Sequence, residues 1–431
     1  MKGEWFMETK KKQSSIADRI LPAILMGAAL SVGGILYVPY TFYVPFQTVF
    51  GLTNTQIGTL TAAYASLAVP GYLVGGVLGD KFNAKILTVI AVISTSLLSL
   101  WMATIPGYKT LLLIYFIMSF TLGLLLWTSQ TKCVRLLGSN EEQGRLNGIA
   151  GMTDSILSVV VFTGFATFLG DRLATKMGMR ALLIFFGLLF LAVGIAIIFF
   201  YDFKKYEKLY GTETDDKVDF KMVVKVIKMP AVWIMASMSF GAYVASTALK
   251  YINPFLSEYF LMPVAMVSIF GAVVQYAIPI VATPIGGFLR DKQGASTPVI
   301  IKTMIPSIAL IAVFMFIPKG PQYLIPATIV ALVLFAIYRT ANNFYYTTLT
   351  EMDVPLNYVG TLIGVAFMLG YSSDLFLPAF LGHLLDKYGL YGYYATFGIA
   401  ILGIVMYIIA ALVLNSQAKK LRARKAAEAA K

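Results

Sequence analysis

The chain is poor in charged residues, which a soluble protein of its length would need for its surface. Only 13% of the 431 residues are charged, whereas 58% are hydrophobic. An ordinary soluble domain has about 25% charged and about 45–50% apolar residues. A single soluble core stops growing near about 250–300 residues, so a chain this long would need polar surface for two domains. We therefore expect most of the chain to lie in a lipid bilayer.

Cysteine and histidine are nearly absent as well. The single Cys133 excludes an intrachain disulfide and a Cys₄ metal site. The single His383 excludes metal sites built on two or three histidines, including the HExxH proteases. The sequence also lacks a phosphate-binding GxxxxGK[ST] loop and a GxSxG turn in a plausible setting. We expect neither an enzyme nor a bound metal or cofactor.

What the chain has instead is a series of long apolar runs. A helix needs about 20 apolar residues to cross the hydrocarbon core of a bilayer. Reading the sequence by this rule predicts an all-α membrane protein with twelve transmembrane helices, near residues 20–45, 57–79, 86–105, 110–132, 146–170, 180–201, 231–257, 266–288, 298–318, 322–349, 357–382 and 391–414.

The basic residues predict how these helices are oriented. Most of the 34 Lys and Arg residues fall in the N-terminal tail, the even-numbered loops and the C-terminal tail. Basic loops stay in the cytoplasm, so both termini are predicted to be cytoplasmic in a plasma membrane, the inner membrane of a bacterium. Topology thus explains the net charge of +13 without a nucleic-acid partner.

The longest polar stretch divides the chain into two halves. We predict a cytoplasmic tail (1–19), a six-helix bundle (20–201), a linker (202–230), a second six-helix bundle (231–414) and a basic cytoplasmic tail (415–431). Within the linker, Lys221, Lys225 and Lys228 share one stripe of a helix, which is typical of an amphipathic helix on a membrane surface. A solvated tether is the alternative.

Two loop motifs recur half a chain apart. Gly75–Lys81 (GGVLGDK) resembles Gly286–Lys292 (GGFLRDK), and residues 169–172 (LGDR) resemble residues 384–387 (LLDK). Such repeats indicate two halves related by an axis along the membrane normal. A carboxylate at the end of a helix can cap or pair with a facing helix in one conformation only. We therefore predict gating roles for Gly76, Asp80, Lys81, Lys85, Arg145, Gly287, Asp291 and Lys292, against the alternative of a plain topological cation cluster.

The first of these motifs resembles the signature of the major facilitator superfamily. Gly76, Asp80, Lys81 and Lys85 match it, whereas Asn83 stands where the family has Gly. The resemblance implies secondary transport. Two further stretches, residues 142–148 and 360–386, are similar to the YihN-type branch of bacterial carriers. The Gly-Asn-rich nitrate signature is missing from the fifth span, so we do not expect nitrate as the substrate.

Four ionisable residues stand out inside the predicted spans: Asp154, Lys250, Arg339 and Asp374. A charge at the bilayer centre costs about 2.5–3.5 kcal/mol, so such residues are candidates for function. Lys250 and Arg339 favour an anionic substrate, unless each pairs with an aspartate and only holds helices together. Asp154 and Asp374 are candidates for proton coupling, with a role as permanent counter-ions left open.

Polar and aromatic residues on single helix faces complete the predicted substrate site. They are Tyr37, Tyr40, Trp127, Gln130, Asn342 and Asn343. For any one aromatic residue, packing is the alternative. The superfamily resemblance implies that helices 1, 4, 7 and 10 line the cavity, with basic residues on helices 1 and 7 in its organic-anion carriers. Lys250 matches this pattern, whereas Tyr37 occupies the corresponding position on helix 1.

Together these observations predict a monomeric secondary transporter of a small organic anion that works by alternating access, with proton coupling or exchange. The alternatives are a carrier of a neutral sugar or drug-like solute, and a ligand-binding sensor derived from a transporter.

Overall fold

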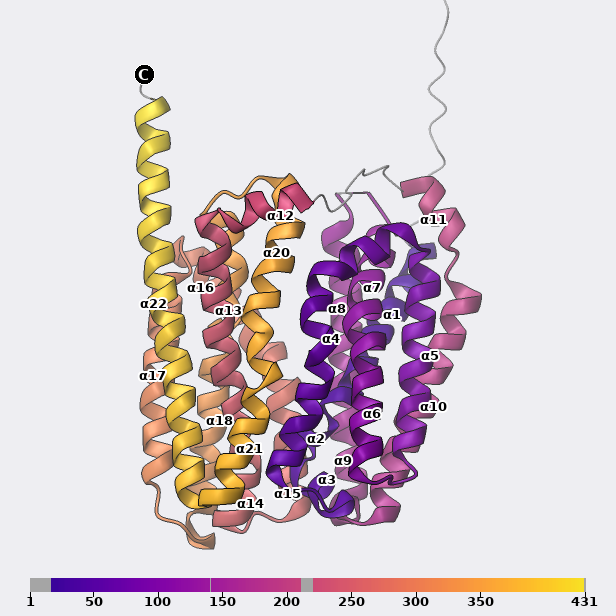
Figure 1. Ribbon diagram of the computed structural model, residues 1–431, viewed down its shortest axis with the longest axis vertical. Helices are drawn as coiled ribbons and strands as arrows, with labels where there is room; N and C mark the ends of the chain where they lie inside the picture. The colour runs from indigo at the N-terminus through magenta and orange to yellow at the C-terminus, as the bar shows by residue number, and fades with distance from the viewer. Residues whose placement is uncertain (1–16, 140, 211–219, 430–431) are drawn as a thin grey trace, which may run out of the picture.

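The structure is a computed structural model that describes residues 17–139, 141–210 and 220–429. The side chains of residues 74–81, 220–221, 356–357 and 429 lie outside the description. The predicted gate residues Gly76, Asp80 and Lys81 are among them, so only their helical backbone is described. The described chain is a bundle of helices in two groups that stand side by side, one from each half of the sequence (Figure 1).

The first half forms six spans, several of them assembled from consecutive helical segments. In order they are α1 (Ala17–Ser31), η1 (Val32–Tyr37) and α2 (Val38–Thr41), followed by the short α3 (Tyr43–Phe50); α4 (Asn54–Lys81); α5 (Ala84–Met102); α6 (Tyr108–Met118), η2 (Ser119–Leu126) and α7 (Trp127–Arg135); α8 (Gln143–Ser158), η3 (Val159–Thr163), α9 (Gly164–Leu169) and η4 (Gly170–Ala174); and α10 (Lys176–Phe200).

The second half repeats this plan after a linker that contains α11 (Phe203–Tyr210) and α12 (Phe220–Ile227). Its spans are α13 (Pro230–Leu249) with α14 (Ile252–Phe260); α15 (Val264–Ala272), η5 (Val273–Ala277) and α16 (Ile278–Gln293); α17 (Thr297–Phe316); η6 (Pro321–Tyr323), α18 (Leu324–Ala341), η7 (Phe344–Thr347) and α19 (Thr348–Glu351); α20 (Leu356–Gly370), η8 (Tyr371–Leu375) and α21 (Leu377–Tyr388); and α22 (Leu390–Ala429).

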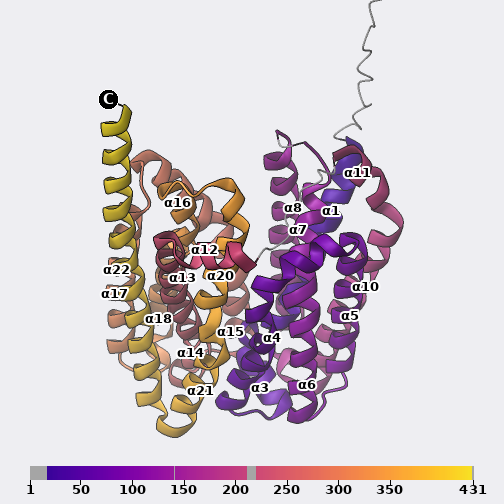
Figure 2. The same cartoon turned by 45° about the horizontal axis from the view of Figure 1, so that its top comes forward.

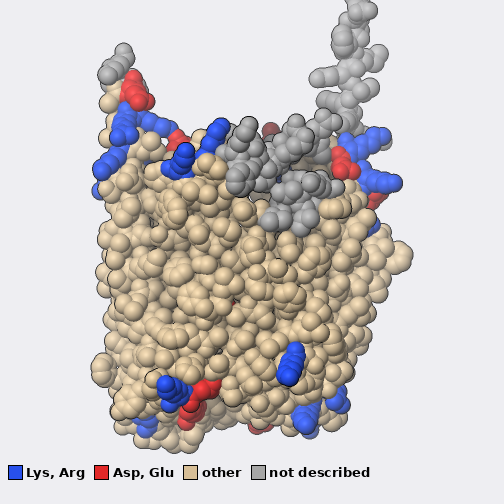
Figure 3. All heavy atoms as spheres, in the orientation of Figure 1, with Lys and Arg blue, Asp and Glu red and all other residues tan. Residues whose placement is uncertain are grey.

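The helices are long and apolar enough to cross a bilayer. Eleven helical segments among the described residues meet that condition. The twelfth span is α4, which has 28 residues and packs within the same bundle. On the face seen in Figure 3, charged side chains gather at the two ends and leave a broad uncharged band between them. The twelve-helix prediction is therefore confirmed, and the protein is a multi-pass membrane protein.

The described ends of the chain lie at one end of the bundle, called here the terminal end (Figure 1). Near the start of α1, the backbone carbonyl of Asp18 accepts a hydrogen bond from the hydroxyl of Tyr206 in the linker helix α11. At the other terminus, α22 continues without a break as far as Ala429, so the segment predicted as a tail from residue 415 is helical over its described part. The end of the bundle away from the termini is called the opposite end.

The linker helix α12 packs against α20 on one side and presents exposed apolar residues on another. Val223 and Val226 on its inner face are buried, and the sulfur of Met222 accepts a hydrogen bond from Thr361 of α20. Val224 and Ile227 are each 41% exposed. The predicted amphipathic helix is thus present, with one apolar flank against α20 and another free to meet the membrane surface.

Several spans change helical type in their middle. The segments η1 and η8 are 3₁₀ turns, whereas η2, η3 and η5 are π-helical. Such irregular turns free backbone groups and redirect side chains, and inside a membrane they are tolerated only where protein or a cavity surrounds them. They bring Tyr37, Gln275 and Asp374 to the middle of the bundle.

The two halves meet closely at the opposite end, where α4 of the first half packs against α21 of the second (Figure 2). A Cβ atom added to Gly58 of α4 would lie 2.1 Å from the backbone carbonyl oxygen of Pro378 in α21. Small residues permit this kind of backbone approach between membrane helices. The halves are therefore in contact at this end.

Candidate functional site

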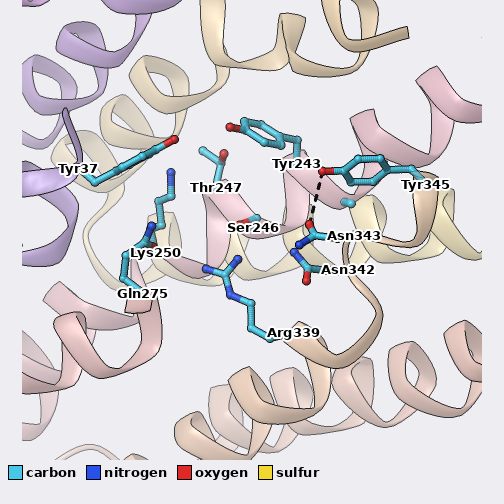
Figure 4. A pocket seen from close by; sticks show the side chains of 11 residues that line it. Tyr37, Tyr243, Ser246, Thr247, Lys250, Gln275, Arg339, Asn342, Asn343 and Tyr345 are labelled. Carbon is cyan, nitrogen blue, oxygen red and sulfur yellow. Dashed lines mark hydrogen bonds between the residues drawn. The ribbon is translucent and has the colours of Figure 1, made fainter. Parts of the chain in front are cut away.

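A cavity of about 130 Å³ lies between the two halves, near the middle of the bundle. Its lining is polar and comes mainly from the second half, with one tyrosine from the first (Figure 4). The lining residues are Tyr37, Ala242, Tyr243, Ser246, Thr247, Lys250, Gln275, Arg339, Asn342, Asn343 and Tyr345.

Lys250 enters this cavity from the C-terminal end of α13. Its Nζ atom lies 4.6 Å from the ring centroid of Tyr40 and 5.4 Å from that of Tyr37. Aromatic faces attract cations at these distances. Because both tyrosines belong to the first half, the contacts cross the boundary between the halves.

Arg339 enters from the last turn of α18, and its guanidinium points into the cavity between Gln275 and the two asparagines (Figure 4). Within the described part of the chain, its Nε atom has no hydrogen-bond partner, and neither does the amide oxygen of the buried Asn342. A buried polar group without a partner is costly, so these two atoms are available to a ligand. Asn343 accepts a 3.4 Å hydrogen bond from the hydroxyl of Tyr345.

Asp374 is the acidic residue nearest to this arrangement. It lies in η8 and interacts electrostatically with Lys250, but its Oδ1 atom has no hydrogen-bond partner among the described residues. Over the same described ranges, neither Lys250 nor Arg339 forms an ion pair with a carboxylate. Among the described residues, none of the four intramembrane charges therefore forms a close ion pair with another, although Asp374 acts on Lys250 through space.

A second, larger cavity of about 620 Å³ adjoins the first, because Tyr37 and Gln275 line both. It runs between α8 and α16 toward the terminal end, past Asn147 and Pro284. The molecule is therefore closed at the opposite end and hollow toward the terminal end.

Asp154 and Trp127 line the larger cavity and not the charged one. The carboxylate of Asp154 accepts a 2.9 Å hydrogen bond from the hydroxyl of Ser31, which ties α8 to α1. The hydroxyl of Tyr40 accepts a 2.9 Å hydrogen bond from the hydroxyl of Thr61. Tyr40 also lines a third, small pocket together with Lys250 and Arg339.

Gln130, which was predicted to bind substrate, lines none of the three pockets described here. Its side chain is buried, and its amide donates a 3.1 Å hydrogen bond to the backbone carbonyl of Met26 in α1. The residue therefore satisfies a backbone group between two helices of the first half instead of facing a cavity.

The gate residues with described side chains lie at the terminal end, and their contacts stay within their own half. Lys85 donates a 2.8 Å hydrogen bond to the carbonyl of Ile198 within its own half. Arg145, Asp291 and Lys292 are exposed. The exposed Asp291 lies 3.6 Å from the guanidinium of its neighbour Arg290.

Sequence neighbours of Arg145 and Gly287 make the closer contacts. In the 142–148 stretch, Glu142 forms a two-pronged, partly buried pair with Arg19 at 2.8 Å, whereas Arg145 is exposed. Likewise, the close helix approach occurs at Gly286, where an added Cβ would meet the carbonyl oxygen of Thr340 at 1.8 Å; at Gly287 it would meet nothing within 4 Å.

Four residues that line the cavity were not predicted from the sequence: Tyr243, Ser246, Thr247 and Gln275. Tyr243, Ser246 and Thr247 precede Lys250 at spacings of seven, four and three residues, which is one face of a helix. That spacing was a usable signal. No sequence pattern marked Gln275 as a lining residue. It lies in the π-helical turn η5 and lines all three pockets.

Comparison with known proteins agrees with this geometry. Inner membrane protein YihN of Escherichia coli (strain K12) is 28% identical over 381 residues, which cover 85% of this chain and 89% of that protein. Inner membrane protein YqcE of the same organism is 24% identical over 360 residues, covering 81% and 83%. The crystal structure of nucleoside transporter NupG superposes with a TM-score of 0.69 at 14% identity, covering 92% of this chain and 98% of that one.

The resemblance to the YihN-type branch is thus confirmed, and the likeness to NupG supports the fold. The model of the family described as Major Facilitator Superfamily matches residues 24–378. Twelve membrane helices in two repeated halves, with a polar cavity between them, are the architecture of a secondary transporter and not of an enzyme. The chain belongs to the major facilitator superfamily.

Proposed function

We propose that the protein carries a small organic anion, with Lys250 and Arg339 as the residues that bind its charged group. The observation that carries the proposal is that two cations line one cavity between the halves without a paired carboxylate among the described residues. Arg339 can grip a carboxylate, sulfonate or phosphate ester in a planar fork, whereas Lys250 supplies a point charge. Asn342 and Asn343 lie beside the guanidinium and can orient hydroxyl groups of the substrate.

The charge balance narrows the class of anion. Asp374 does not line the cavity but interacts electrostatically with Lys250. With all three groups ionised, the two cations and Asp374 carry a net charge of +1, which a monoanion neutralises. When Asp374 takes up a proton, the site gains one positive charge and would accommodate a second negative charge on the cargo. Asp374 is thus our candidate for proton coupling, ahead of Asp154, whose carboxylate is bound by Ser31.

The proposed cycle runs between a state open to the cytoplasm and a state open to the outside. The basic tails and loops favour the terminal end as cytoplasmic. In that orientation the present conformation faces inward, because its larger cavity extends toward the terminal end. We also expect the protein to act as a monomer.

A ligand screen on the purified protein tests the proposal. Monocarboxylates, dicarboxylates, sulfonates, phosphate esters and neutral sugars are compared in a thermal-shift assay, since a ligand at 100 times its Kd stabilises the folded state by about 2.7 kcal/mol. We expect a monoanion to raise the melting temperature of the wild type, and Lys250→Gln and Arg339→Gln to abolish the shift. Lys302→Gln is the matched control, because Lys302 is an exposed cation of the same half outside the cavity.

Hits are then tested for uptake into proteoliposomes. Stabilisation by neutral sugars alone, or a shift that survives both cavity variants, would overturn the organic-anion proposal. Binding of an anion without uptake would favour the ligand-binding sensor.

A further inference from the structure

At the opposite end of the molecule, one carboxylate of the second half is bound by the first turn of a helix in the first half. Asp386 of α21 accepts hydrogen bonds from the backbone N–H of Asn54 at 3.0 Å and of Thr55 at 2.7 Å, where α4 begins. The side chains of the same two residues donate to it at 2.8 Å and 2.6 Å.

These four contacts form a helix cap that is supplied from the other half. The first N–H groups of a helix have no partner within the helix, and the positive end of the helix dipole attracts an anion. The cap therefore satisfies α4 only while the two halves touch. Separating them at this end breaks all four hydrogen bonds and leaves the first N–H groups of α4 without this partner.

A second contact of the same kind runs in the reverse direction. Asp171 in η4 of the first half accepts a 3.0 Å hydrogen bond from the backbone N–H of Ala265, in the first turn of α15 of the second half. Each half thus supplies one carboxylate and one helix start to the other.

The repeat in the sequence explains the reciprocity. Asp171 and Asp386 occupy the same place in the recurring motifs LGDR and LLDK, half a chain apart, and α4 and α15 begin the corresponding spans of their halves. A contact made by one copy is therefore repeated by the other, as two-fold pseudo-symmetry requires. Neither aspartate lines any of the three pockets described above, so neither is a substrate ligand in this conformation.

We propose that Asp386 and Asp171 are a pair of latch residues that hold the opposite end closed and release when the carrier opens there. This role is independent of the identity of the cargo. Asp386 is the stronger latch, because it makes four hydrogen bonds across the boundary and Asp171 makes one. Opening at this end requires both caps to break together.

Distances between spin labels across the opposite end test the latch. Labels on Lys109→Cys and Tyr391→Cys report on the two halves, because both residues are exposed and lie near that end. The full-length protein is measured in lipid nanodiscs, and Cys133 can stay, because it is fully buried. Asp386→Asn keeps the size of the side chain but removes the charge.

The two latch variants have graded expected outcomes. Because Asp386 is exposed, water weakens each of its contacts, so we expect Asp386→Asn to raise the ratio of long to short distances by about fivefold. Asp171→Asn should raise the ratio less, and the double variant more than either.

The matched control is Glu258→Gln. Glu258 is an exposed acid at the same end, and it accepts its hydrogen bond from Tyr393 of its own half. Its loss should leave the distances unchanged.

Thr55→Val covers the case in which Asp386→Asn fails to fold. It removes only the 2.6 Å hydroxyl contact and should shift the ratio in the same direction by a smaller factor. If Asp386→Asn or Thr55→Val gives the same distance distribution as Glu258→Gln, the latch proposal is overturned. Because this readout needs no substrate, its failure would leave the organic-anion proposal standing, and the reverse also holds.

Discussion

The ion pair between Arg19 and Glu142 provides a sharp test of how the terminal end of the first half is stabilised. Arg19, in the first turns of α1, has a side chain that is only 2% exposed, and it meets Glu142 in the loop before α8 through two hydrogen bonds of 2.8 Å. Arg19 also bonds the carbonyl of Leu137 at 2.9 Å. The pair thus ties three segments of the first half together.

Replacing Glu142 by Gln removes the charge and leaves one acceptor. Breaking a buried pair costs about 3–5 kcal/mol, but the Glu142 side chain is 21% exposed and Arg19 keeps its bond to Leu137. We therefore expect a loss of about 2 kcal/mol at pH 7, in the range of hydrogen bonds to charged groups. Thermal unfolding in detergent measures it.

The pH dependence of this loss has a definite sign. The hydrogen bonds from Arg19 hold the pKa of Glu142 at about 2, below its ordinary value of 4.5. A lowered carboxyl pKa stabilises the fold fully above pH 4.5, and this contribution disappears as the pH falls toward 2. The gap between the wild type and Glu142→Gln should thus shrink between these values. Glu141→Gln, at an exposed neighbour, is the control. The reasoning is refuted if both variants unfold alike at pH 7, or if the gap does not change with pH.

Three further predictions follow from individual contacts. Cys133 is fully buried, so a thiol-reactive dye should label the native protein slowly and report unfolding as a rise in fluorescence. Gln130→Leu removes the bond to the Met26 carbonyl and should cost about 1 kcal/mol in thermal unfolding, with ligand affinity unchanged. The exposed ion pair between Lys425 and Asp353 joins side chains that are 59% and 61% exposed, so Lys425→Ala should change the melting temperature by less than the error of the assay.

The membrane fold could be predicted from the sequence because each transmembrane helix is marked by its own long apolar run. An apolar run of sufficient length can satisfy its backbone in lipid only as a helix, so each span could be found without knowledge of its neighbours. Lys250 and Arg339 were found by the same argument, because a charge within such a run is conspicuous wherever it points. The structure then brings both into one cavity.

Partners in space were harder to predict than positions in the chain. Gln130 shares a helix face with Trp127, but the sequence does not reveal that a backbone carbonyl of α1 lies within its reach. The LGDR and LLDK repeat indicated that Asp171 and Asp386 are equivalent, yet it contained no information on which helix each would cap. Such contacts depend on how two halves pack, and no local pattern encodes that packing.

The distribution of charge between the halves suggests how cargo and latch could act on one another. Both proposed anion-binding residues belong to the second half, whereas Tyr40 and Tyr37, which hold the ammonium of Lys250, belong to the first. In the proposed cycle, an anion that draws Lys250 toward Arg339 weakens a contact between the halves in the middle of the bundle. The hydrogen bonds of Asp386 and Asp171 at the opposite end then make up a larger share of the contacts that hold the halves together. Cargo binding and opening thus act on a single equilibrium, because each removes contacts between the two halves.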